Sequence, residues 1–223
     1  AHDLPPRGAQ GPQGRVLARP LRDRDRERVE DDEAAHEQGD RAEAEEEGAE
    51  YDEHVWLSLR NAETLCTAIT NALGELDPDH KDVYTANAST YLQKLDQLDQ
   101  SYRQTVDAAA RKTLLFGDRF PFRYLVDDYG LTYYAAFAGC SAESEASFET
   151  VSFLANKVDE LALPCVLTIE GTQHKIAETI VQNTKKKDQK VLTMDSMQAT
   201  TSDDVKADTT YLSVMEKNLG VLK

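Results

Sequence analysis

The second half of the sequence constrains the fold most, because short apolar runs alternate there with amphipathic segments. The runs of strand character are Thr113–Phe116, Thr132–Ala136, Cys165–Ile169 and Lys190–Met194. Helices are predicted near Phe120–Tyr129, Phe148–Leu161, Gln173–Thr184 and Asp203–Leu219. Strands that alternate with helices are typical of an α/β fold with right-handed crossovers. We therefore expect a doubly wound, mostly parallel sheet with flanking helices.

A long helix is predicted ahead of this sheet. Residues Asn61–Glu75 have apolar side chains at helical spacing and form a short amphipathic helix. Pro78 is placed to open a second helix, which can continue to about Arg111 without an internal proline or glycine. About 34 residues at a rise of 1.5 Å span ~50 Å, so this helix should run along or between lobes as a backbone.

The first fifty residues differ in composition from the rest. They contain no aromatic residue, and an acidic run, AEAEEEGAE, closes them. Such a segment cannot bury enough apolar area to offset the entropy of ordering it. We expect three parts: a disordered, charged tail over 1–50, a short and a long helix over 51–111, and an α/β lobe over 112–223.

The charge of the chain excludes some function classes. The 223 residues include 25 Lys and Arg against 41 Asp and Glu, giving a formal charge of −16. A general nucleic-acid binder needs a basic surface, so no nucleic-acid partner is expected. No run approaches the ~18 apolar residues of a membrane span, and no signal peptide is visible. The three cysteines are too few and too scattered for a disulfide framework or a thiolate zinc site.

Polar side chains that directly follow predicted strands are the main candidates for function, because ligands bind at the carboxyl ends of parallel strands. Asp118, Glu170 and Asp195 occupy such positions, and His54 precedes the first helix beside the only tryptophan. Imidazole and carboxylate groups together suit a divalent cation such as Zn²⁺. Arg119, next to Asp118, cannot coordinate a metal, since its guanidinium has no free lone pair.

Each candidate also has a purely structural interpretation. A histidine before a helix often packs or caps, and a carboxylate after a strand often caps the next helix or closes a turn. Nucleotide-binding and hydrolase signatures such as GxGxxG, GxxxxGK[ST], GxSxG and HExxH are absent. No nucleophile–base pair is evident either, so an enzyme is not expected.

Several motifs occur in the order seen in one family. The series begins with the run Asp52-Glu53-His54-Val55-Trp56-Leu57-Ser58 and continues with the long helix. After the helix come Phe122-x-Tyr124 with Tyr129-Gly130-Leu131, then Glu170, and then Asp195-Ser196. The ending Tyr211…Met215…Asn218 completes the series. From about Tyr51 to Lys223 the chain resembles the metal-binding solute receptors of zinc and manganese ABC importers. The individual motifs are weak, but their common order over ~170 residues is specific.

The resemblance implies a metal site. His54 and Asp195 match the family's ligands, Asp118 is a tentative third ligand, and Glu170 is expected to support a ligand rather than bind the ion. Arg119 occupies the position of the family's third ligand. The family also has an amino-terminal lobe ahead of the His-Val-Trp motif, where this chain has its low-complexity segment. The chain thus corresponds to the family's carboxy-terminal lobe plus backbone helix, and in it we expect Tyr91, Leu95 and Leu98 to face water.

The expected function follows from that resemblance. The chain would capture Zn²⁺, or alternatively Mn²⁺, and deliver it to a membrane permease. It would do so outside the cytoplasm, as a periplasmic protein or a lipoprotein. The resemblance also implies cell adhesion as an associated role of the family. The alternative is a flavodoxin-like interaction module in which the metal site has been lost. Arg119 favours the alternative, whereas the presence of both His54 and Asp195 favours the receptor.

Overall fold

The computed structural model describes residues 52–137, 146–171 and 173–223. The predicted tail over 1–50 lies outside these residues. The helices and turns before the sheet are η1 (Val55–Leu57), α2 (Leu59–Leu76), η2 (Pro78–His80) and α3 (Lys81–Ala108). The remaining elements are β1 (Thr113–Phe116), α4 (Arg123–Tyr129), β2 (Thr132–Ala135), α5 (Phe148–Glu160), β3 (Cys165–Ile169), α6 (Lys175–Asn183), β4 (Lys190–Met194), α7 (Ser202–Lys206) and α8 (Tyr211–Leu222).

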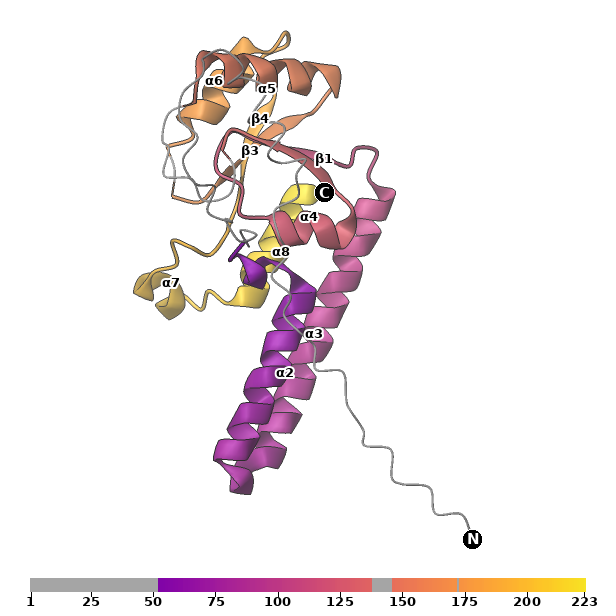
Figure 1. The fold of residues 1–223 in the computed structure, drawn as a ribbon, viewed down its shortest axis with the longest axis vertical. Coiled ribbons are helices and arrows are strands. Elements are labelled where there is room, and N and C mark those ends of the chain that lie inside the picture. Colours follow the sequence, from indigo (N-terminus) through magenta and orange to yellow (C-terminus); the bar gives the residue numbers. More distant parts are fainter. Residues whose placement is uncertain (1–51, 138–145, 172) are drawn as a thin grey trace, which may run out of the picture.

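The four strands form one parallel sheet in the order β2-β1-β3-β4. Alternate residues of each strand point to opposite faces. Leu115 and Val166 pack with α5 and α6 on one face, whereas Phe116, Leu167 and Met194 pack with α3, α4 and α8 on the other (Figure 1). This arrangement confirms the predicted doubly wound α/β fold.

Helices α2 and α3 form an antiparallel pair that extends away from the sheet (Figure 1). Ser58 caps α2 by accepting a hydrogen bond from the Asn61 amide. Between the two helices, the η2 turn begins at Pro78, so the predicted long helix opens with a 3₁₀ turn. No helix among the described residues has the length and apolar content needed to cross a membrane.

The expected exposure of the long helix is wrong for its second half. Leu95 is 0% exposed and Leu98 7% exposed, and Tyr91 is partly buried against the same core. These side chains pack against α2, α4 and α8, elements of this chain that cover that face. The exposed large apolar side chains of the pair lie toward its far end: Ile69, Leu73, Leu76 and Val83.

Two hydrogen-bonded contacts fix α3 against the sheet layer. Tyr102 donates to the Met215 carbonyl of α8 at 2.6 Å. The buried Asp99 carboxylate accepts from Arg103 Nε at 2.7 Å and from the Tyr129 hydroxyl at 3.0 Å. The Arg103 pair lies within α3, whereas the Tyr129 bond joins α3 to α4 and the Tyr102 bond joins α3 to α8. Because the low dielectric of an interior strengthens hydrogen bonds, these two hold the end of α3 in one register.

The predicted last helix is two helices. Thr201 caps α7 and Thr210 caps α8, each through a reciprocal bond with the residue three positions on. Asp208, between them, has a positive φ of 59°, which ends α7. The second helix is thereby free to lie against β4, where it contacts the segment that carries Asp195.

Candidate metal site

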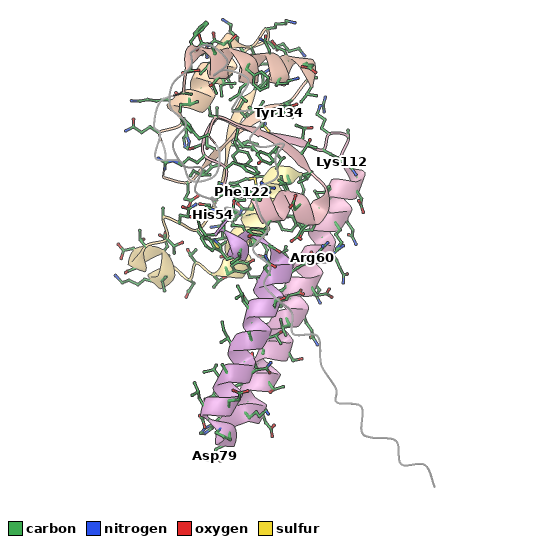
Figure 2. The ribbon with its side chains drawn as sticks, in the orientation of Figure 1. His54, Arg60, Asp79, Lys112, Phe122 and Tyr134 are labelled. Carbon is green, nitrogen blue, oxygen red and sulfur yellow. The ribbon has the colours of Figure 1, made fainter. Side chains whose placement is uncertain are left out.

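His54 lies at the junction between the helical pair and the α/β layers (Figure 2). It is 3% exposed. Its backbone N–H donates to Asp52 Oδ1 at 2.9 Å, and its ring Nδ1 lies 2.8 Å from the same oxygen. The Asp52 carbonyl accepts a hydrogen bond from the Tyr124 hydroxyl at 2.7 Å, which anchors this segment to α4. The imidazole is therefore held by a short turn that is itself fixed to the core.

Trp56 connects the His54 segment to the loop that follows β4. Its indole Nε1 donates to the Ser196 carbonyl at 3.0 Å, a contact between residues 140 positions apart. The Tyr211 hydroxyl donates to the Trp56 carbonyl at 2.8 Å, and the Trp56 ring lies 5.3 Å from the His54 ring. The first of these bonds places Ser196, which follows Asp195, against Trp56, which is two positions after His54.

Asp195 is held at its backbone by Asn218 of α8. The Asp195 amide donates to Asn218 Oδ1 and the Asn218 side-chain amide donates to the Asp195 carbonyl, both at 2.8 Å. The carboxylate is half-buried, and its Oδ1 accepts from the Met197 amide at 2.8 Å. Burial raises the pKa of the Asp195 carboxyl, the Met197 hydrogen bond opposes this, and the nearby Glu170 charge raises it further. A partly desolvated carboxylate of this kind gains from a bound cation.

Both oxygens of Glu170 are engaged by the same loop. Oε2 accepts from the Ser196 amide at 2.7 Å, and Oε1 accepts from the Ser196 hydroxyl at 2.8 Å and from the Gln198 amide at 3.0 Å. Glu170, at the end of β3, thereby fixes the loop after β4. These contacts join Glu170 to the segment that follows Asp195, and its supporting role at a metal ion stays a prediction.

Asp118 lies at the end of β1 and is 8% exposed. Its Oδ1 accepts from the Arg119 amide at 2.9 Å and its Oδ2 accepts from the Ile169 amide at 3.3 Å. The carboxylate therefore bridges the carboxyl ends of two neighbouring strands. The position follows Gly117, which the fold requires, since a Cβ there would lie 2.5 Å from Ala177 Cα.

The potential ligand atoms are only partly brought together. Within the described ranges, one group of three or more His, Cys, Asp or Glu side chains has its ligand atoms within 4.8 Å of one another, and it is Asp52, Glu53 and His54. Asp118 does not join His54 and Asp195 in a cluster this compact. Asp52 and Asn218 are not among the predicted site residues, yet Asp52 contacts the His54 ring and Asn218 contacts the Asp195 backbone, each at 2.8 Å. The D-x-H spacing was the available signal for Asp52.

Comparison with known proteins identifies relatives along most of the chain. The model of the family described as "Zinc-uptake complex component A periplasmic" matches residues 13–223. The zinc-binding lipoprotein AdcA of Streptococcus pneumoniae strain R6 is 33% identical over 174 residues, which cover 78% of this chain and 34% of AdcA. The chain therefore spans about a third of the length of that relative.

Solved structures of metal-binding proteins are similar to this chain in fold. The Zn(II)-bound ZnuA-like domain of S. pneumoniae AdcA has a TM-score of 0.64 and 31% identity, over 79% of this chain and 64% of that one. The laminin-binding protein Lmb of Streptococcus agalactiae, described as a bifunctional protein with adhesin and metal-transporting activity, has a TM-score of 0.65 and 29% identity, over 77% of this chain and 63% of that one.

Proposed function

Because this chain belongs to the family of zinc-uptake complex component A, we propose that it is the metal-capturing part of a zinc ABC uptake system. In this role it binds a divalent ion outside the cytoplasm and passes it to a membrane permease. The ion is cargo, so no bond is made or broken and the protein is not an enzyme. Relatives described as periplasmic or as lipoproteins support the extracytoplasmic position.

The observation that carries the proposal is the link between the two predicted ligands. His54 is oriented by its own turn, and Asp195 is fixed by Asn218 and by the Glu170-bound loop. The Trp56–Ser196 hydrogen bond joins the two segments. One imidazole and one carboxylate suit Zn²⁺ and also permit Mn²⁺.

The affinity of this chain for zinc should be limited by the number of side chains that coordinate the ion. A structural or transported zinc ion prefers four ligands, and His54 with Asp195 supplies two. We propose that Asp118 supplies a third after a local movement and that water completes the shell. We also propose that the chain divides into helices over 51–111 and an α/β lobe over 112–223, with the segment 1–50 as a tail outside the site.

Zinc should stabilise the folded chain in a saturable way. A ligand that binds only the folded state stabilises it by RT ln(1 + [L]/Kd), about 2.7 kcal/mol at a hundred times Kd. We expect the thermal midpoint to rise with added ZnCl₂ and equilibrium dialysis to give one saturably bound ion per chain. The same concentration of MgCl₂ is the control, because a protein of charge −16 attracts cations diffusely. An equal response to both ions would contradict the receptor function and favour the interaction module, which Arg119 would suit.

A further inference from the structure

The side chain of Asp52 is nearly buried and contacts His54 twice. Asp52 is 6% exposed, and its Oδ1 contacts both the backbone N–H and the ring Nδ1 of His54. Its backbone carbonyl is fixed by Tyr124 of α4. With its backbone anchored in this way, the Asp52 carboxylate cannot turn toward another partner without breaking its two contacts to His54.

The chemistry of this contact sets which ring nitrogen carries the proton. An ionised carboxylate only accepts hydrogen bonds, so Nδ1 must donate. In a neutral imidazole the other nitrogen, Nε2, then carries the lone pair that can coordinate a metal. Metal-binding histidines commonly have such a carboxylate partner, which fixes the ring and increases its basicity.

We propose that Asp52 is a positioning residue that holds His54 with its proton on Nδ1 and so presents Nε2 to the ion. Asp52 is accordingly not a ligand, although it lies in the compact group with Glu53 and His54. The zinc part of this inference rests on the proposed function, whereas the state of the His54 ring in the metal-free chain does not.

Glu53 provides a matched control. It is adjacent to Asp52, exposed, and belongs to the same compact group. The substitutions Asp52→Asn and Glu53→Gln each remove one negative charge beside His54, but only the first alters the contact to Nδ1. The asparagine side chain retains an oxygen that can accept from the His54 amide, so the turn should persist. Its NH₂ group can also face Nδ1 and favour the other ring proton position.

The experiment combines nitrogen NMR of the metal-free full chain with zinc titration. In the parent and in Glu53→Gln, the His54 ring should give the ¹⁵N pattern of a protonated Nδ1 and an unprotonated Nε2. In Asp52→Asn the pattern should shift toward protonated Nε2, and zinc affinity should fall about 10- to 100-fold. Affinity in Glu53→Gln should change by less than about threefold, because that side chain makes no contact to Nδ1 in the proposed arrangement.

Three results would overturn the proposal: a protonated Nε2 in the parent, a parent-like ring pattern in Asp52→Asn, or equal loss of affinity in both variants. Equal loss would mean that charge alone, or all three side chains as ligands, is responsible. If the parent binds no zinc in a saturable way, the proposed function fails, and the ring pattern still decides whether Asp52 positions His54.

Discussion

The substitution Asp195→Asn should abolish the saturable response to zinc while leaving the metal-free chain slightly more stable than the parent. The first effect follows from loss of the one carboxylate that we pair with His54. Removing a ligand from a site that has few should lower affinity by more than about 100-fold, beyond the range of the titration. The substitution His54→Gln should have the same effect on zinc.

The second effect follows from the raised pKa of the Asp195 carboxyl. A carboxyl whose pKa is higher in the folded than in the unfolded chain contributes stability while it is protonated in both states. That stability is lost as the pH rises through the folded-state pKa. At neutral pH the ionised Asp195 therefore costs stability, by about half a kcal/mol or less, because the group is half-exposed and screened by solvent.

Chemical denaturation at pH 7, with and without zinc, checks both effects. The amide side chain of the Asp195→Asn variant keeps an oxygen that can accept from the Met197 amide, so the loop should be preserved. Asp203→Asn is the control, since it removes a charge from a carboxylate that is 89% exposed on α7. A zinc response in Asp195→Asn as large as that of the parent would exclude Asp195 as a ligand.

The substitution Gly117→Ala should destabilise the fold and disturb the end of β1. The added Cβ would lie 2.5 Å from Ala177 Cα and 2.8 Å from Ala177 N, which belong to the backbone of α6. Ala177 is 0% exposed, so α6 cannot move without separating from the sheet. Overpacking of this kind costs about 1–3 kcal/mol, and the displaced Asp118 should lose its bond to the Ile169 amide.

Gly220 offers the matched control for this substitution. It lies in α8, and a Cβ added there would meet nothing within 4 Å. Gly220→Ala should therefore be neutral or stabilise the chain by up to about 0.5–1 kcal/mol through helix propensity. Urea unfolding of the two variants measures the difference. Equal stability of Gly117→Ala and the parent would mean that α6 packs against β1 less closely than described.

The fold could be predicted well where local pattern and tertiary context agree. The strands Thr113–Phe116, Cys165–Ile169 and Lys190–Met194 have the predicted bounds, because each is a short apolar run covered by helices on both faces. The two last helices are predicted as one, because the apolar pattern alone does not show that the chain turns at Asp208 and that a new cap follows at Thr210. The predicted exposure of Leu95 and Leu98 is wrong because α8, distant in sequence, covers them.

The sequence allows a candidate site to be proposed as a set of residue types but not as a geometry. His54 and Asp195 are identifiable from their places beside predicted elements and from the resemblance. The position of His54 relative to Asp195 depends on two hydrogen bonds, from Trp56 to Ser196 and from the Asp195 amide to Asn218. Both bonds are set by how α8 and the loop after β4 pack. Periodicity carries no information on such contacts.

The most direct test of the account is X-ray absorption at the zinc edge of the zinc-loaded chain. If His54 and Asp195 hold the ion, the first shell should contain only nitrogen and oxygen, with the outer-shell scattering of one imidazole. His54→Gln exposed to the same zinc concentration should retain no ion with that imidazole signal. Sulfur in the first shell, or an imidazole signal that survives in His54→Gln, would contradict the assignment of His54 as the metal ligand of this chain.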